Sequence, residues 1–134
     1  VTPTARRSFN PDGTMVNTHG DYPDAARKVA QEENLPLIDL TALSTKLFQT
    51  MGEEGTKKAF EVNPQTGAID NTHFQPYGAY ELAKIIVQDI KDQKLSIAKF
   101  LIDTPPFDPT HPDPVEKFSW PPSPKYDPVK PEGN

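Results

Sequence analysis

The sequence predicts an α/β fold of the doubly wound type, in which parallel strands and helices alternate along the chain. Short apolar runs of strand length are followed by segments with helical apolar spacing, in the order strand, helix, strand, helix, helix. The 134 residues have the length of one domain, and ten of the 16 prolines follow residue 103. We therefore expect a packed part at residues 1–103 and an extended proline-rich tail at residues 104–134.

The chain is predicted to open with the remnant of a strand, a long polar loop and a helix. The first residues, "VTP", indicate the end of a buried strand whose front is missing, and residues 4–20 are polar. Asp21 follows at a helix-capping position, with Pro23 in the first helical turn, where proline is favoured. The apolar run at residues 37–40 is then expected to be a buried parallel strand.

The middle of the chain is predicted to be helical before it becomes a loop. In residues 41–52, "TALSTKLFQTMG", the larger apolar side chains fall on one helical face, and Gly52 is suited to end the helix. A second, short helix is expected at residues 53–60, and a loop is expected at residues 61–75.

The clearest predicted helix runs from Pro76 to about Asp92, and a shorter one is expected at residues 94–102. Its apolar residues recur at the spacing of an amphipathic helix: Ala79, Leu82, Ala83, Ile86, Val87 and Ile90. Two parallel strands do not suffice to close a core against these helices, so the fold is expected to be incomplete on its own. The remainder would come from upstream sequence, a separate chain or a swapped copy.

Charge and composition argue against several classes of function. The net charge of -5 and the pI near 5.1 leave no basic stripe to meet the phosphates of nucleic acid. Because the chain has no cysteine, it has neither a thiolate metal site nor a cysteine nucleophile. No apolar run approaches the ~18 residues that a membrane-spanning helix needs, and no signal peptide opens the chain. We therefore expect neither nucleic acid nor a membrane as a partner.

The stretch "IDNTHFQPYGAYELA" places Asp70 three residues before His73, just ahead of the clearest helix. A histidine acts as a general base when one ring nitrogen faces a hydroxyl group and a carboxylate holds the other. A tight loop would bring these two side chains within ~2.6–3.2 Å of each other. In the alternative interpretation, Asp70 and Thr72 bond backbone amides of a turn, and His73 is a surface residue. A metal site is disfavoured, because His19 and His111 lie in unrelated segments.

The residues around this pair closely resemble a known family. "DNTHFQPYGAYELA" is similar to the last motif block of the SGNH (GDSL-type) hydrolases, and more narrowly to the rhamnogalacturonan acetylesterase-like carbohydrate esterases. The stretch "VTPTARRSFNPDGTMVNTHGDYPDAARKVAQEENLPLIDLTALS" is similar to the same branch, so the resemblance covers about residues 1–102. It implies the C-terminal half of a flavodoxin-like, three-layer fold.

The resemblance also implies roles for Asp70 and His73 in the triad of a serine esterase. His73 would be the general base and later the general acid, and Asp70 would be the carboxylate that orients it. The family's nucleophilic serine in a G-D-S block, its oxyanion glycine and the asparagine of its G-x-N-D block have no counterpart in these 134 residues. No serine of the chain has such surroundings: Ser8, Ser44, Ser96, Ser119 and Ser123.

The loop after the first strand supplies candidates for substrate binding. Arg6 and Arg7 would meet the carboxylates of a galacturonate-rich polymer, and His19 would line the same cleft. The alternatives are a loop arginine paired with a nearby aspartate and a histidine that belongs to a turn. In the tail, Trp120 and Tyr126 are expected to anchor the chain to the packed part, with stacking on sugar rings as the alternative.

The sequence thus predicts the C-terminal portion of an SGNH-type carbohydrate acetylesterase that acts on acetylated pectic polysaccharide such as rhamnogalacturonan. The complete enzyme would use serine attack aided by His73, an acetyl-enzyme and hydrolysis by water, and no metal or organic cofactor is implied. By resemblance alone, such an enzyme would be secreted or periplasmic. The second hypothesis is a non-catalytic remnant that binds glycan or a partner protein through its loops and tail.

Overall fold

The structure, a computed structural model, describes residues 1–121, which form three α-helices, one short hairpin and two 3-10 turns. In chain order these elements are α1 (Tyr22–Glu32), α2 (Leu40–Thr56), β1 (Phe60–Val62), β2 (Ile69–Phe74), α3 (Pro76–Asp92), η1 (Ser96–Phe100) and η2 (Val115–Lys117). The two strands are antiparallel. The class is therefore α/β, as expected, although the strands lie elsewhere than the sequence predicts.

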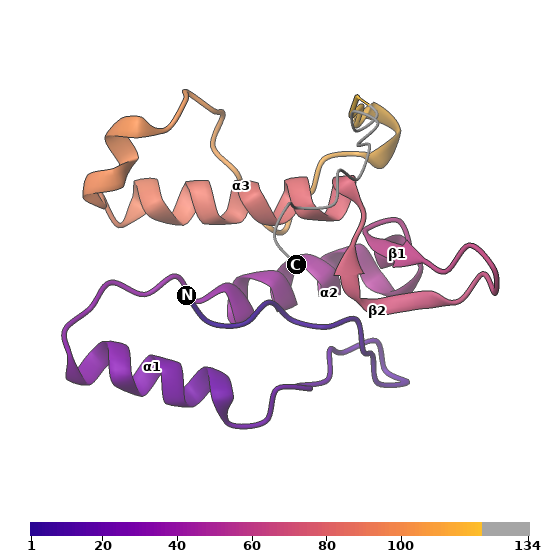
Figure 1. Cartoon of the computed structure of the whole chain (residues 1–134), viewed down its shortest axis with the longest axis horizontal. Helices are drawn as coiled ribbons and strands as arrows, with labels where there is room; N and C mark the ends of the chain where they lie inside the picture. Colours follow the sequence, from indigo (N-terminus) through magenta and orange to yellow (C-terminus); the bar gives the residue numbers. More distant parts are fainter. Residues whose placement is uncertain (122–134) are drawn as a thin grey trace, which may run out of the picture.

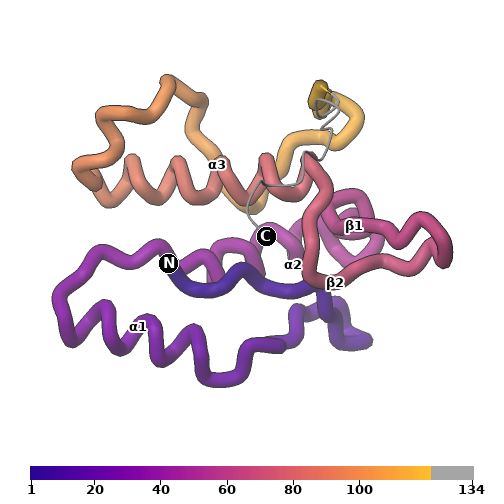
Figure 2. Tube along the Cα trace, viewed as in Figure 1, coloured from indigo at the N-terminus to yellow at the C-terminus, as the bar shows by residue number. Residues whose placement is uncertain are grey.

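The hairpin lies at the end of the molecule where α3 begins. Figure 1 shows this arrangement, and contacts join α3 to both α2 and β2. In that view the N-terminal segment runs between α1 and α3, and the tube in Figure 2 shows it reaching the region of β2. A hydrogen bond from the Arg7 N–H to the Asn71 carbonyl oxygen (3.0 Å) fixes this approach. The start of the chain thus lies against the strand that carries Asp70 and His73.

The two parallel strands predicted from the sequence are not formed within the described residues. Thr2 and Ile38 are neighbours, but they are joined by a single backbone hydrogen bond, from the Thr2 N–H to the Ile38 carbonyl oxygen (3.0 Å). The chain then enters α2 at once, because Asp39 caps this helix and accepts the Ala42 amide at 3.3 Å. The prediction of a strand at residues 37–40 is therefore wrong, since Leu40 already belongs to α2.

Two further boundaries differ from the prediction. α2 breaks at Gly52, as expected, because this residue has φ 71° and ψ 174°, outside the helical range. The helical turn beyond it ends at Thr56 and does not reach residue 60. Residues 61–75, predicted to be a loop, contribute to the hairpin, whose turn is closed by Asn63. The side-chain oxygen of this asparagine accepts two amides of the turn, at 2.9 and 3.0 Å.

α3 has the predicted bounds, but only part of the predicted apolar stripe is buried. Its buried residues are Tyr77, Gly78, Glu81, Leu82 and Ile85. Ala79 and Ala83 of the predicted stripe are exposed. Leu82 of the stripe is buried, and Ile86 and Ile90 pack against the core. At Gly78 the helix approaches Ala59 closely, because a Cβ there would lie 2.2 Å from the Ala59 carbonyl oxygen. The absence of a side chain at Gly78 permits this approach.

Three phenylalanine rings form the part of the core that lies beside the hairpin. Phe48 of α2 and Phe60 of β1 are fully buried, with ring centroids 5.1 Å apart. Phe74 of β2 packs on both, at 6.1 Å from Phe48 and 4.7 Å from Phe60. Each buried phenylalanine side chain contributes about 1.5–3 kcal/mol relative to an exposed one. Because Phe74 directly follows His73, this core holds the strand that carries the histidine.

Part of the proline-rich segment is tied to α3 by charged groups. The carboxylate of Glu81 is fully buried and lies 2.8 Å from Nζ of Lys84. The same Nζ lies 2.7 Å from the carboxylate of Asp113, and the Tyr77 hydroxyl donates to the Asp113 carbonyl oxygen at 2.7 Å. Burial raises the pKa of Glu81, and it raises the pKa of Tyr77 to about 12. These contacts bind the segment around Asp113 to the helix.

Aromatic rings add to this attachment. Phe118 packs against Tyr77, with centroids 5.6 Å apart, and Trp120 stacks on Phe118 at 6.4 Å. Because Trp120 is 60% exposed and stacks on a neighbour in its own segment, its predicted role as an anchor stays a prediction. Tyr126, predicted to have the same role, lies outside the described residues.

Candidate active site

Asp70 and His73 lie on a bulged part of β2. The two paired positions of the hairpin are two residues apart on β1 but five residues apart on β2. Three additional residues of β2 therefore stand out of the ladder, and their backbone amides need other partners. A bulge of this kind re-aims side chains, and here it directs the catalytic candidates away from the phenylalanine core.

The Asp70 carboxylate bonds both the turn and the histidine. One oxygen accepts the amides of Thr72 (2.7 Å) and His73 (3.0 Å), which the bulge withdraws from the ladder. The other oxygen lies 2.8 Å from Nδ1 of the His73 ring. Both alternatives considered from the sequence are therefore present. One oxygen of Asp70 bonds the backbone amides of the turn, and the other bonds the imidazole of His73.

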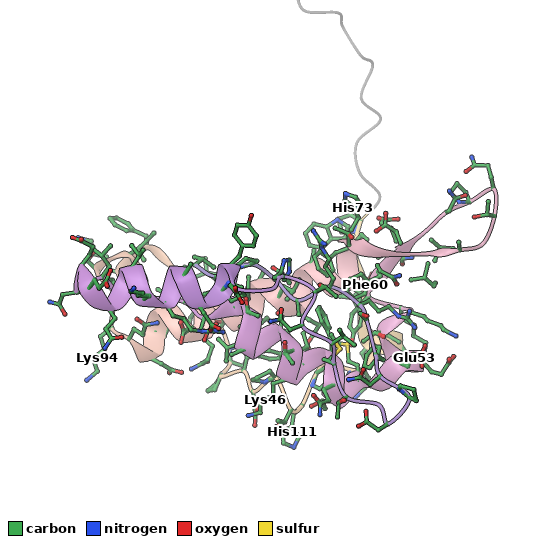
Figure 3. All side chains as sticks on the ribbon, turned by 90° about the horizontal axis from the view of Figure 1, so that it is seen from below. Lys46, Glu53, Phe60, His73, Lys94 and His111 are labelled. Atoms are coloured by element: carbon green, nitrogen blue, oxygen red, sulfur yellow. The ribbon has the colours of Figure 1, made fainter. Side chains whose placement is uncertain are left out.

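The His73 ring, held through Nδ1, leaves Nε2 for a reactant. The side chain is 75% exposed, and within residues 1–121 no hydrogen-bond partner contacts Nε2. Figure 3 shows His73 at the surface beside the hairpin, whereas Phe60 lies within the body. When Nδ1 donates its proton to Asp70, Nε2 carries the lone pair that a general base requires.

The pKa of Asp70 is lowered to about 2. The largest cause is the hydrogen bond from the His73 ring, followed by the amides of His73 and Thr72. Because the folded pKa lies below the ordinary value of 3.8, these bonds stabilise the fold fully above pH 3.8. Their contribution is lost as the pH falls through about 2.

We expect the Asp70 carboxyl to titrate near pH 2 in the wild-type chain and nearer 3.8 in His73→Ala, because the principal hydrogen bond is then removed. Carbon-13 NMR of the carboxyl groups measures both midpoints. Asp108 is the control, since its pKa is also lowered to about 2 but chiefly by Thr110. A midpoint of Asp70 that does not move in His73→Ala would contradict this account.

A second Asp-x-x-His pair in the chain shows what the spacing gives by itself. Asp108 and His111 also pair through Oδ2 and Nδ1, but at 3.2 Å instead of 2.8 Å. The His111 ring also contacts the Thr110 hydroxyl at 2.9 Å, and its side chain is 82% exposed. The spacing alone therefore brings the two side chains together, and it is the surroundings that distinguish Asp70 and His73.

The three residues predicted to bind substrate occupy two different places. Arg6 and His19 line one small pocket of about 100 Å³, in which Nε2 of His19 lies 2.8 Å from the Thr4 carbonyl oxygen. Arg7 lies elsewhere, with its side chain only 10% exposed and bonded to α2 and to Asn71. Substrate binding by all three stays a prediction. Sequence reasoning missed the partners of Arg7, because residues so far apart in the chain leave no spacing signal.

No serine of the described residues bonds the His73 ring. Ser44 is fully buried in α2, where its hydroxyl donates to the Leu40 carbonyl at 2.5 Å and accepts the Ala5 amide at 2.9 Å. Within residues 1–121, no three side chains of the metal-binding types gather at one point. The same residues contain no helix with the length and apolar character to cross a membrane.

Comparison with known proteins relates the chain to one group of enzymes. No protein-family model matches it, and neither does a solved structure. It is 36% identical over 109 residues to "Rhamnogalacturonan acetylesterase RhgT" of Bacillus subtilis (strain 168), covering 76% of this chain and 47% of that protein. It is 36% identical over 102 residues to "Probable rhamnogalacturonan acetylesterase YesY" of the same organism, covering 76% and 46%.

The chain thus spans about half the length of the curated relatives it matches. The resemblance predicted from the motif block around Asp70 and His73 is confirmed, because both relatives carry the name of that branch. The chain is therefore related to the rhamnogalacturonan acetylesterases, the SGNH-type carbohydrate esterases that its last motif block resembles.

Proposed function

We propose that this chain supplies the aspartate and the histidine of a Ser-His-Asp triad in a carbohydrate acetylesterase. The proposed substrate is acetylated pectic polysaccharide such as rhamnogalacturonan, the polymer in the names of both relatives. One observation carries the proposal. The imidazole of His73 is held by Asp70 at 2.8 Å, while its exposed Nε2 has no partner among residues 1–121.

In the proposed reaction, Nε2 of His73 accepts the proton of the serine hydroxyl as its oxygen attacks the acetyl carbonyl carbon. The tetrahedral intermediate then collapses, the bond to the sugar oxygen breaks, and the imidazolium returns its proton to the leaving sugar hydroxyl. Water hydrolyses the acetyl-serine with the same proton transfers, releasing acetate. Asp70 stays ionised throughout, as its pKa of about 2 requires, and stabilises the imidazolium.

The serine and the oxyanion donors are proposed to come from outside these 134 residues, from upstream sequence, a separate chain or a swapped copy. α3 supports this proposal, because its most apolar stripe is incompletely covered. Ala79 and Ala83 are exposed, and three further members of the stripe are only half-buried: Ile86, Val87 and Ile90. The segments around Thr2 and Ile38, which share one backbone hydrogen bond, would pair with added parallel strands and complete a flavodoxin-like sheet.

The 134-residue chain alone is expected to hydrolyse an aryl acetate no faster than buffer, because it lacks both a covalent nucleophile and oxyanion donors. Adding a segment that carries the G-D-S and G-x-N-D blocks is expected to produce acetate release. This release should vanish in His73→Ala and persist in His111→Ala, which removes the histidine of the second Asp-x-x-His pair. Turnover by the chain alone that depends on His73 would contradict the prediction.

The second candidate is a non-catalytic remnant that binds glycan or a partner. It is favoured by the observation that, within residues 1–121, no serine hydroxyl contacts His73. It predicts saturable binding of pectic oligosaccharide with no acetate release after the complementing segment is added. For the enzyme we further propose export to the periplasm or the extracellular space, where such a polymer is met, and cell fractionation tests this.

A further inference from the structure

We infer that Arg7 is a positioning residue for the catalytic candidates, because it holds the bulge of β2 that presents Asp70 and His73. The importance of this positioning for catalysis rests on the proposed function. The contacts of Arg7 themselves lie within residues 1–121.

Arg7 bonds the bulge through both its main chain and its side chain. Its backbone N–H donates to the Asn71 carbonyl oxygen at 3.0 Å, and Nη1 donates to the Asn71 side-chain oxygen at 3.3 Å. Asn71 stands directly between Asp70 and Thr72, at the start of the turn. Two bonds from one residue therefore restrain both the position and the rotation of the backbone that aims the Asp70 carboxylate.

The other edges of the guanidinium are fixed to the end of α2. Nε donates to the Thr56 hydroxyl at 3.1 Å, and Nη2 donates to the Glu53 carbonyl oxygen at 3.0 Å. The Glu53 carboxylate lies 3.6 Å from the same nitrogen. The last carbonyls of a helix lack partners within the helix and favour a cation nearby. The bulge is thereby joined to a helix in which the side chains of Leu47 and Phe48 are fully buried.

The number of acceptors on one planar group makes this link a firm one. The Arg7 side chain is 10% exposed, whereas Asp70 and His73 are 38% and 75% exposed. Its bond to Thr56 is partly buried, its bonds to the Asn71 side chain and the Glu53 carbonyl are exposed, and the guanidinium fixes all three acceptors at once. Asp70 alone cannot supply this restraint, because it is part of the segment that must be held.

The second Asp-x-x-His pair provides a comparison without such a link. No arginine hydrogen bond reaches Asp108 or His111 in the described part of the chain, and their Oδ2–Nδ1 distance is 3.2 Å. In Asp70 and His73, whose turn is bonded to Arg7, the same distance is shorter, 2.8 Å. A shorter distance in this pair is expected if the bonds from Arg7 restrain the turn.

The test is NMR spectroscopy of the His73 ring in the 134-residue chain, which requires no esterase activity. In the wild type, we expect the neutral ring to be mainly the Nδ1–H tautomer and the Asp70 carboxyl to titrate near pH 2. In Arg7→Gln, we expect a mixture with the Nε2–H tautomer and an Asp70 midpoint that moves toward 3.8. Arg7→Lys retains the charge but not the fork, so it should restore the wild-type signals only in part.

Arg27→Gln is the matched control. Arg27 also ties distant segments together, through Asp39 at 2.8 and 2.9 Å and Asp24 at 2.6 Å, but bonds no residue of the bulge. It should lower the midpoint of urea unfolding while leaving the His73 tautomer and the Asp70 titration unchanged. Equal shifts in Arg27→Gln and Arg7→Gln would mean general destabilisation and would overturn the inference.

A folded Arg7→Gln chain with wild-type tautomer and titration would overturn it equally. If Arg7→Gln does not fold, Asn71→Ala gives the decision, because it removes only the side-chain acceptor at 3.3 Å. A smaller shift in the same direction is then expected, and its absence would reject the inference. Acetate release is measured separately in the assembled enzyme, so failure of the proposed esterase function does not imitate either result.

Discussion

In the assembled esterase, His73→Ala is expected to lower kcat for acetyl-ester hydrolysis by roughly 10⁴-fold or more, with little change in KM. In the proposed mechanism, this variant removes the group that takes the serine proton, whereas the residues proposed to bind substrate are unchanged. Asp70→Asn is expected to cost about 10⁴-fold, because an amide in place of the carboxylate favours the wrong tautomer of the ring.

Acetate release from acetylated rhamnogalacturonan oligosaccharides, measured over a range of substrate concentrations, separates kcat from KM. His111→Ala is the matched control, since this histidine has the same relation to Asp108 but lies in the proline-rich segment. Retention of activity within about tenfold of the wild type in His73→Ala would remove this histidine from the reaction.

Gly78→Ala is expected to destabilise the fold by about 1–3 kcal/mol. A Cβ at this position would lie 2.2 Å from the Ala59 carbonyl oxygen and 2.9 Å from its carbon, and these backbone atoms cannot rotate away. The same carbonyl accepts the Gln75 amide at 3.0 Å, so displacing it also loosens the connection between β2 and α3.

Urea unfolding of Gly78→Ala and Gly55→Ala measures this effect against a matched change. A Cβ at Gly55 would meet only the Cβ of Met51, at 3.4 Å, which is an ordinary contact. Because alanine is the better helix former, Gly55→Ala should be neutral or stabilising by up to about 1 kcal/mol. Equal midpoints for the two variants would contradict the close packing of α3 on Ala59.

The features that the sequence predicts well are those that neighbouring residues decide. α3 has its predicted bounds because its start at Pro76 and its apolar periodicity are local signals. The turn residues of the hairpin, Asn63 and Gly67, were also present in the sequence. The hairpin was nevertheless missed, because β1 has only three residues and the bulge interrupts the alternation along β2.

Contacts between distant segments decide the features that the sequence did not predict. The burial of Tyr77, Gly78 and Glu81 beside the predicted stripe accompanies a close backbone approach between Gly78 and Ala59, which apolar periodicity does not encode. A strand at residues 37–40 requires neighbouring strands, and the sequence of the strand itself does not show whether they are present. Within the site, the spacing predicts that Asp70 reaches His73. Nothing near these residues in the sequence indicates that Arg7 bonds the turn between them.

The attachment of Asp113 to α3 has a consequence for the design of fusions that carry this chain on another protein. A fusion that ends at residue 103, where the proline-rich composition begins, would discard the Asp113 carboxylate, one of the two carboxylates that contact Lys84. It would also remove the backbone carbonyl that accepts the Tyr77 hydroxyl, so α3 would lose its polar contacts with this segment. A fusion that keeps these contacts therefore includes the chain as far as Trp120, although residues 104–120 are rich in proline.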